Sequence, residues 1–446
     1  MRARINDIAQ KSPSLFALIV FAAIIAAVTA LLLLPHARSG PGSASLLEAL
    51  FTATSAVCVT GLTIVDTATF WSPFGQTIIA IGMQIGGLGV MTLASLLGLA
   101  VSRHIGLTQR ILTASETKSK LGDVVSLLRA VFITSASVEL LLTLAFLPTF
   151  LQRNHGLLEA CAQSVFMSIS TFNNGGFVIL PEGMEGYISN WGMCIPIIAG
   201  TIVGALGFPV ILNIADNWRT PRKWSLHAKM TLLTYGVLFL LGTGAILVLE
   251  WANTRTMGTL DLGSKILVAL THSATARSSG LSTIDIGSMN ESTWWLVDGL
   301  MFVGGGSAST SGGLKVSTFA VLILAIVAEA RGDRDVEAFG KRISPNVIRL
   351  AVSAMFLGAA MVGTATLIIL HISDFPLSHI LFETVSAFGT CGLSTGITAR
   401  LPALGQGVII VLMYLGRVGT MTFAAALSAR RRQRMVRLPE ESPVIG

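Results

Sequence analysis

The chain has 446 residues, of which 52% are hydrophobic and only 12% are charged, and its mean hydropathy is +0.74. These values exclude an ordinary soluble globular protein and favour one polytopic membrane domain, because long apolar runs recur from end to end. The net charge of +7 does not indicate nucleic-acid binding, since the basic residues cluster in particular loops, as topology signals do. The four cysteines show no CxxC spacing, so neither a disulfide framework nor a zinc site is predicted.

The first long apolar run, 14–34, has the length of a helix that crosses a bilayer. It is longer than the apolar region of a signal peptide and has no clear cleavage site, so we predict an uncleaved span. A segment at 43–56 is too short to cross. The sequence FTATSAVCVTGLTIVD then leads into a second long span near 74–101. The predicted unit is therefore a long span, a half-length helix, a loop of small residues and a second long span.

This unit recurs three more times, and each loop aligns on one glycine followed by Leu or Phe. A glycine recurring at nearly constant spacing in the same hydropathy frame indicates an internal repeat. The glycines are Gly61, Gly176, Gly280 and Gly392. The later spans are predicted at 130–152 and 191–215, at 230–249 and 294–328, and at 350–372 and 403–429, with half-length helices at 157–171, 262–276 and 377–388.

We therefore predict an all-α polytopic membrane protein with four tandem helix–re-entrant pore loop–helix repeats around a pseudo-fourfold pore, like a potassium channel. The predicted repeats are 1–102, 103–218, 219–342 and 343–446, and their pore loops are 43–66, 157–183, 262–286 and 377–397. Most Lys and Arg residues lie in the N-terminus, the three linkers or the C-terminal tail, which predicts that both termini and the linkers are cytoplasmic.

Acidic residues follow the pore loops on the opposite, outer side, notably Asp66, Glu182 and Asp285. At the mouth of a pore they would raise the local concentration of cations. Acids in solvated loops are common, so an ordinary surface role remains the alternative for any one of them.

Each half-length helix would enter from outside and end in mid-membrane, with the partial negative charge of its last carbonyls directed at the axis. Glycine permits the dihedral angles that turn successive carbonyls the same way, and rings of backbone carbonyls bind dehydrated K⁺. We predict a K⁺ selectivity filter; four re-entrant packing loops without an ion function are the alternative. The predicted filter residues are Val57, Cys58, Val59, Thr60, Gly61, Asn173, Asn174, Gly175, Gly176, Arg277, Ser278, Ser279, Gly280, Gly389, Thr390, Cys391 and Gly392.

The sequence GGGSASTSGGLK interrupts the apolar stretch 294–328. Gly, Ser and Thr are poor helix formers, and broken backbone at membrane depth is tolerated only where protein covers it or water fills a cavity beside it. We predict that this stretch lies across the ion pathway. Its residues are Gly304, Gly305, Gly306, Ser307, Ala308, Ser309, Thr310, Ser311, Gly312 and Gly313, followed by Lys315. Leu314 separates Gly313 from Lys315, which breaks the spacing of a phosphate-binding loop, so no nucleotide site is predicted in this chain.

Isolated charges occur within or beside the apolar segments, where a charge at the membrane centre costs roughly 2.5–3.5 kcal/mol. We expect Arg277 behind the filter, bonded to carbonyls or to Glu383, because a cation inside a cation pore would repel ions. Lys315 and Arg417 are expected to face the pore below the filter, where they lower ion occupancy or hold the loop in place. For Arg417 a structural pairing is an equal alternative. Glu139 is expected to pack against a polar neighbour.

Several segments resemble the bacterial Ktr/Trk potassium-uptake family, which is related to the plant HKT transporters. They are TSAVCVTGLTIVDTATFWSPFGQ, FMSISTFNNGGF, GGGSASTSGGLK, ETVSAFGTCGLSTGIT and YLGRVGTMTF. The resemblance covers almost the whole chain and is closer to the ion-translocating KtrB-type subunit, because the chain starts at the first repeat. It implies potassium uptake through a gated, channel-like subunit in the bacterial plasma membrane, with 304–313 as the gate and Arg417 beneath the filter. In the plant relatives a Ser at the first filter glycine accompanies Na⁺ preference, so Gly61 favours K⁺; Gly175 stands where the family suggests Ala.

The resemblance also implies a homodimer in the lipid bilayer, seated on a cytoplasmic ring of nucleotide-binding regulatory subunits (KtrA type), with K⁺ in the filter and Na⁺ as an activator. The alternative is a Na⁺-conducting or Na⁺/K⁺-coupled secondary transporter of the same fold. Four matched glycine loops argue against coupled transport, for which twofold repeats are expected. No enzyme is predicted, because no catalytic pair falls at a plausible spacing.

Overall fold

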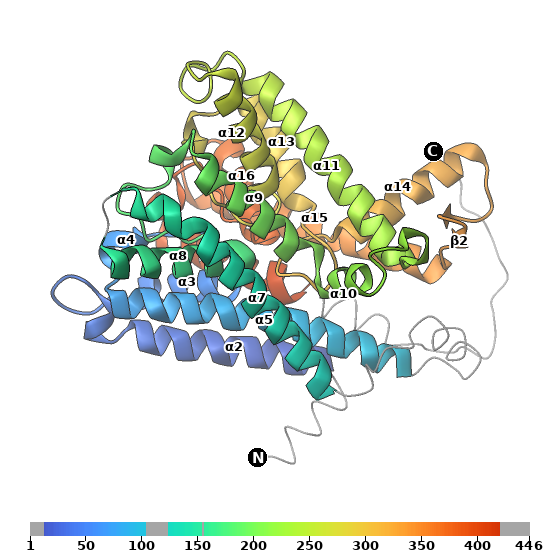
Figure 1. Ribbon diagram of the computed structural model, residues 1–446, viewed down its shortest axis with the longest axis horizontal. Helices are drawn as coiled ribbons and strands as arrows, with labels where there is room; N and C mark the ends of the chain where they lie inside the picture. The colour runs from blue at the N-terminus through green and yellow to red at the C-terminus, as the bar shows by residue number, and fades with distance from the viewer. Residues whose placement is uncertain (1–12, 104–123, 154–155, 420–446) are drawn as a thin grey trace.

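The computed structural model describes residues 13–103, 124–153 and 156–419, and most of them are helical (Figure 1). The first repeat contains α2 (Pro13–Leu32), α3 (Leu46–Val57), the short α4 (Thr67–Phe70) and α5 (Pro73–Arg103); the second contains α7 (Val124–Leu151), α8 (Leu157–Phe172), α9 (Trp191–Leu206) and α10 (Phe208–Asp216). The third contains α11 (Leu226–Glu250), α12 (Leu262–Thr275), α13 (Glu291–Phe302) and α14 (Val316–Arg331); the fourth contains α15 (Pro345–Ile372), α16 (Leu377–Gly389), α17 (Ala403–Tyr414) and a π-helical turn (Leu415–Gly419).

The connections carry little regular structure. A two-stranded antiparallel hairpin, β1 (Glu337–Ala338) and β2 (Lys341–Arg342), lies beyond the end of α14 (Figure 1). Single 3₁₀ turns lie at Pro35–Ala37, Glu185–Tyr187, Pro221–Lys223, Ile286–Ser288 and Thr398–Arg400. Most of the first linker (104–123), the end of the last predicted span (420–429) and the predicted cytoplasmic tail that follows it lie outside the described residues, and the predicted repeat boundaries stay predictions.

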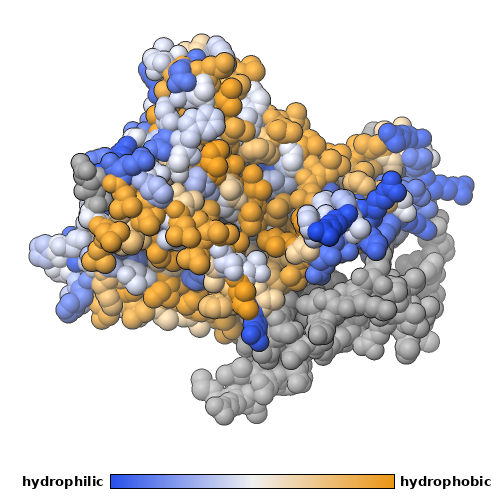
Figure 2. All heavy atoms as spheres, viewed as in Figure 1, coloured by the Kyte–Doolittle hydropathy of each residue, from blue (hydrophilic) through white to orange (hydrophobic). Residues whose placement is uncertain are grey.

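Within the described residues, three helices have the length and apolar composition to cross a membrane: α7 over Leu128–Leu151, α11 and α15. The bent pair of α9 and α10 passes the same test together. Their large hydrophobic side chains face outward, as with Leu141 on α7, Leu240 on α11 and Phe356 on α15, which are 66%, 67% and 77% exposed. Figure 2 shows hydrophobic residues over the middle of one face and hydrophilic residues toward its edges. An apolar exterior of this kind suits lipid, so the chain is a multi-pass membrane protein, as predicted.

The helices pack in a closed cycle. Each half-length helix contacts the first span of its own repeat, in the pairs α2–α3, α7–α8, α11–α12 and α15–α16. Each also contacts the second span of the preceding repeat, in the pairs α5–α8, α9–α12, α13–α16 and α17–α3. Because the last pair joins the fourth repeat to the first, the four units surround one axis. The half-length helices lie inside this ring, and their last turns are buried except for the half-buried Ile169 on α8.

The predicted continuous span at 191–215 is wrong. It breaks at Gly207, and α9 and α10 meet at 95°. Gly207 has φ +90°, a left-handed conformation that suits glycine, and Pro209 supplies no N–H near the start of the second helix. The last span also departs from a regular α-helix, since its π-helical turn begins at Leu415. Irregularity in the second span is therefore not confined to the third repeat.

Candidate ion pathway

The four aligned glycines meet at the centre of the ring. Each adopts a left-handed backbone, with φ of +90°, +72°, +64° and +96° for Gly61, Gly176, Gly280 and Gly392. A methyl group added to each glycine would lie closer than 3.0 Å to the carbonyl oxygen just before the next repeat's glycine. These oxygens belong to Gly175, Ser279, Cys391 and Thr60, in the same order. The loops therefore contact one another in chain order and close on themselves, and no side chain fits at these positions.

The backbone before each glycine shares a second feature. Val59, Asn174 and Thr390, each two residues before its glycine, have φ of +55°, +59° and +46°. Non-glycine residues seldom adopt this conformation. In each of these three loops, one residue separates the two residues with positive φ. This alternation changes the direction of successive backbone carbonyls. Ser278, at the equivalent place in the third repeat, is not among the positive-φ residues.

Side-chain oxygens of the filter loops are buried without a protein partner. They are Thr60 Oγ1, Asn173 Oδ1, Asn174 Oδ1, Ser278 Oγ, Ser279 Oγ and Thr390 Oγ1. Buried polar atoms ordinarily find a hydrogen-bond partner, so water or an ion is the expected partner of such oxygens. They do not all face the axis, since a methyl group at Gly87 would meet Asn173 Oδ1 and one at Gly312 would meet Thr390 Oγ1.

The remaining predicted filter residues lie where each helix ends. Val57 and Gly389 are the last residues of α3 and α16, and Cys58 follows Val57 as its cap. Asn173 caps α8, and Arg277 follows the cap of α12. The sequence interpretation missed the serine six residues before the glycine in three repeats. Ser55 Oγ accepts from Gly61 N at 3.0 Å, Ser386 Oγ accepts from Gly392 N at 3.1 Å, and Ser170 Oγ donates to Phe177 O at 2.8 Å.

It also missed a set of glycines on the second spans. A methyl group at Gly86, Gly204 or Gly416 would lie closer than 3.0 Å to the carbonyl oxygens of Val57, Phe172 and Phe388, respectively. Those three carbonyls stand four residues before the filter glycines. Each glycine thus allows a second span to approach the end of its own half-length helix. The recurring GxxG of GGLG, GALG and GRVG was the available signal.

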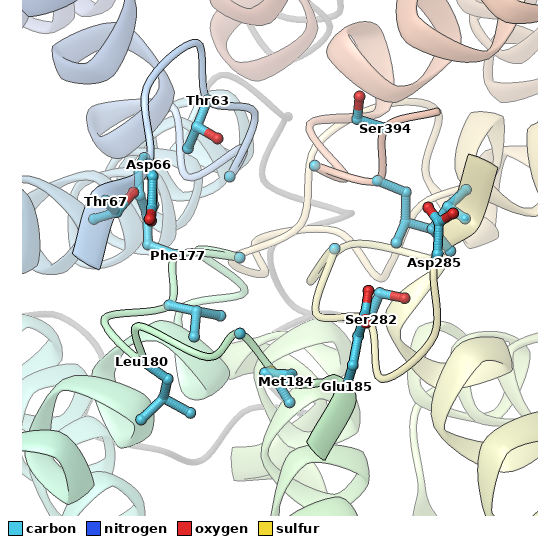
Figure 3. Close-up of a pocket in the computed structure, with 18 of the residues that line it drawn as sticks. Thr63, Asp66, Thr67, Phe177, Leu180, Met184, Glu185, Ser282, Asp285 and Ser394 are labelled. Atoms are coloured by element: carbon cyan, nitrogen blue, oxygen red, sulfur yellow. The ribbon is translucent and has the colours of Figure 1, made fainter. Parts of the chain in front are cut away.

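A cavity of about 570 Å³ opens above the glycine ring (Figure 3). Its lining includes all four glycines together with Asp66, Glu182, Glu185 and Asp285. The predicted position of the outer acids at the mouth is confirmed. Asp66 and Asp285 also cap short helices, accepting from Ala68 N and Gly287 N at 3.0 Å each.

Glu182 belongs to a small cluster at the rim of this cavity. It pairs with Arg153 at 3.3 Å while remaining 82% exposed. The Arg153 guanidinium lies 4.0 Å from the Tyr187 ring centroid and donates to Gly186 O at 2.6 Å. Burial raises the pKa of the Tyr187 hydroxyl, and the Arg153 charge opposes that rise. The rim is therefore fixed by packing as well as by charge.

The glycine-rich loop, 304–313, joins α13 to α14 below the ring and is mostly buried. Its ends pair with each other, since Gly304 N donates to Leu314 O at 2.8 Å and Leu314 N donates to Phe302 O at 3.2 Å. The middle of the loop forms hydrogen bonds with the backbone on either side of the break between α9 and α10. Gly306 N donates to Ala205 O at 2.7 Å, and Phe208 N donates to Ala308 O at 3.2 Å. The break in the second repeat and the loop of the third thus satisfy each other's backbone groups.

Three basic residues bond to carbonyls around this loop. Arg277 donates to Tyr235 O at 2.9 Å and to Gly304 O at 3.1 Å, which confirms carbonyl partners. Lys315 Nζ donates to Ser311 O at 2.5 Å, and Arg417 Nη1 donates to Thr310 O. They therefore hold the loop in place. An additional effect of Lys315 and Arg417 on ion occupancy stays a prediction.

Two of the acids in the membrane helices, Glu383 and Glu139, have polar partners. Glu383 is not bonded to Arg277; it accepts from Thr395 N at 2.9 Å and from the hydroxyls of Ser394 and Thr398. Those residues belong to the loop just outside Gly392. The prediction of a polar neighbour for Glu139 is confirmed, because its carboxylate accepts from Gln84 at 2.8 Å and Asn173 at 3.2 Å.

Known proteins agree with this geometry. Residues 12–436 match the TrkH family, described as cation transport protein. The chain belongs to this family. Membership confirms the prediction of a transporter rather than an enzyme, and it agrees with the family resemblance noted from the motifs.

Individual relatives cover nearly the full chain. The Ktr system potassium uptake protein B of Bacillus subtilis is 36% identical over 97% of this chain and 96% of its own length. The potassium/sodium uptake protein NtpJ of Enterococcus hirae is 32% identical over 100% of this chain and 98% of its own length. The crystal structure of the potassium transporter TrkH from Vibrio parahaemolyticus aligns with a TM-score of 0.73 at 17% identity, covering 93% of this chain and 84% of that one. That likeness establishes the fold.

Proposed function

We propose that this chain is the ion-translocating, channel-like subunit of a gated K⁺ uptake system. The observation that carries the proposal is the ring of Gly61, Gly176, Gly280 and Gly392, whose loops contact one another in order and leave no room for a side chain. Rings of carbonyl oxygens replace the hydration shell of K⁺. The acids of the outer cavity supply cations to this ring.

The named relatives support K⁺ as the cargo. One is a potassium uptake protein B of a Ktr system, and it matches nearly the whole chain. NtpJ is described as a potassium/sodium uptake protein, which favours Na⁺ conduction or Na⁺/K⁺ coupling as the second candidate. An intact glycine at Gly61 supports K⁺ over Na⁺, by the family resemblance.

The loop 304–313, with Lys315 and Arg417, is the gate in this proposal. Its burial below the ring and its bonds to four separate helices support that role. The system contains two copies of this chain in the bacterial plasma membrane and a cytoplasmic ring of KtrA-type nucleotide-binding subunits. Na⁺ acts as an activator, and both termini of this chain are cytoplasmic. The Ktr system name of the relatives supports a multi-subunit assembly.

The deciding experiment is K⁺ uptake in a host that lacks its own K⁺ transporters, with and without a nucleotide-binding partner. We expect growth at low K⁺ that increases with the partner. Reconstituted protein separates the two candidates: faster ⁸⁶Rb⁺ than ²²Na⁺ flux supports K⁺ selectivity, and equal flux supports the Na⁺-conducting candidate. Flux that disappears without a second ion gradient would show coupled transport.

A further inference from the structure

Thr310 occupies the point where the loop 304–313 meets the filter. Its side chain is fully buried. Thr310 Oγ1 accepts from Asn174 Nδ2 at 2.6 Å and donates to Phe172 O at 3.4 Å. Its backbone N–H donates to Gly204 O at 3.3 Å, and its carbonyl accepts from Arg417. One residue of the loop therefore contacts the end of α8, the filter loop of the second repeat, α9 and the last span.

Asn174 is the filter side of this contact. It stands two residues before Gly176 with φ +59°, a conformation that asparagine tolerates better than most residues. A methyl group at Gly204 would lie 3.0 Å from both Asn174 Nδ2 and Thr310 Oγ1, so α9 packs closely against this pair at a glycine. The amide of Asn174 is thus held by Thr310, while its Oδ1 has no protein partner.

Two more contacts join the same loop to the other filter loops. Arg277, three residues before Gly280, donates to Gly304 O at 3.1 Å. A methyl group at Gly312 would lie closer than 3.0 Å to Thr390 Oγ1, two residues before Gly392. The loop therefore contacts the filter loops of the second, third and fourth repeats. Among these three contacts, only that of Thr310 with Asn174 in the second repeat is a hydrogen bond between two side chains.

We propose that Thr310 is a positioning residue for the filter and that it acts through Asn174. When the loop 304–313 is displaced and the ion pathway opens, the filter loop of the second repeat would lose this support. This inference rests on the proposed function. It makes ion preference depend on the state of the gate: the seated loop favours K⁺ strongly, and the displaced loop favours it less. A loop that only blocked the path would change the flux and leave the preference constant.

The test compares Thr310→Val with wild type in proteoliposomes, measuring ⁸⁶Rb⁺ and ²²Na⁺ flux. Valine keeps the shape and removes the hydroxyl. Loss of one hydrogen bond, about 1 kcal/mol, corresponds to about a fivefold change. We expect basal Rb⁺ flux to rise and the Rb⁺/Na⁺ ratio to fall by about that factor. Asn174→Gly, which keeps the left-handed backbone, should lower the ratio similarly, and the double variant should be no worse than either single variant.

Two further variants control for folding and for the chemical change. Thr310→Ser retains the hydroxyl and should restore the wild-type ratio. Thr243→Val makes the same change on α11, where the hydroxyl bonds only to Phe239 O of its own helix, and should alter neither quantity. Raised flux in Thr310→Val with a wild-type ratio would overturn the inference, as would additive effects in the double variant. Absence of Rb⁺ preference in the wild type would instead overturn the proposed function.

Discussion

The guanidinium of Arg277 spans the gap between filter and loop, donating to Gly304 O at 3.1 Å while lying 3.6 Å from the Tyr235 ring centroid. Its second bond, to Tyr235 O, anchors the same group to α11. Arg277 is fully buried, and each of its two terminal guanidinium nitrogens donates a hydrogen bond to a backbone carbonyl. This arrangement keeps its charge behind the filter.

Replacing Arg277 with Met should destabilise the protein. Gly304 O would lose its donor, and a buried acceptor left unpaired costs about 1–3 kcal/mol, whereas Tyr235 O would lose only its bond to Arg277 because it lies within α11. Thermal unfolding in detergent should show a clearly lower midpoint. Arg255→Met, which removes an exposed arginine, is the control and should melt like wild type. If both variants unfolded at the same midpoint temperature, Arg277 would not contribute to stability.

Gly61→Ser should reduce the preference for K⁺ over Na⁺. The substitution places a Cβ on a residue with φ +90° and 2.8 Å from Gly175 O, so the ring must shift. The ⁸⁶Rb⁺/²²Na⁺ flux ratio measures the effect. Gly332→Ser is matched for backbone strain, with φ +74°, but has no atom within 4 Å, and its ratio should stay at the wild-type value. A wild-type flux ratio in Gly61→Ser would contradict the assignment of Gly61 to the filter.

Shortening the loop between Gly305 and Gly312 should raise basal flux. Deletion removes the backbone bonds to Ala205 and Phe208 that seat the loop below the ring. Flux without any regulatory partner is the measurement. If flux stayed low and dependent on the partner, the gate would have to lie elsewhere. Size-exclusion chromatography of the variant verifies that the shortened chain is folded.

Glu383→Gln should weaken the outer filter loop of the fourth repeat. The carboxylate accepts from Thr395 N and from the hydroxyls of Ser394 and Thr398, and an amide can accept on only one oxygen. We expect a lower melting midpoint together with a lower Rb⁺/Na⁺ ratio. Glu291→Gln makes the same change at an exposed site where Ser378 is the bonded partner, and it should alter neither property. Unchanged selectivity in Glu383→Gln would limit Glu383 to a packing role.

Glu182→Gln should slow cation entry at low ionic strength. The change removes one negative charge from the mouth and takes away the ion-pair partner of Arg153. The Debye length falls from about 30 Å at 0.01 M to about 3 Å at 1 M, so the difference from wild type should vanish at high salt. Glu329→Gln on α14 is the matched control outside the mouth. A deficit that persists at high salt would indicate a structural effect instead.

The sequence was sufficient for the glycines and the half-length helices, because each is a local pattern repeated four times. Hydropathy did not reveal the break at Gly207, since 191–215 is apolar throughout; Gly207 and Pro209 were the local signal, and the loop that packs into the bend comes from a different repeat. A methyl group added to Gly207 would lie 2.5 Å from Ser307 O, so the close approach of the third repeat's loop to the bend requires glycine there. Likewise, nothing local to Arg277 distinguishes Gly304 O from Glu383 as its partner. In both cases the partner is set by tertiary contacts, which the local sequence does not show.

The contact between α17 and α3 has a consequence for biosynthesis. It joins the last repeat to the first, so the first half-length helix lacks its contact with the last span until residues beyond 403 have been inserted. The Thr60 carbonyl, likewise, meets Gly392 only at that stage. A nascent or truncated chain that ends before Gly392 therefore lacks the fourth repeat's side of the glycine ring.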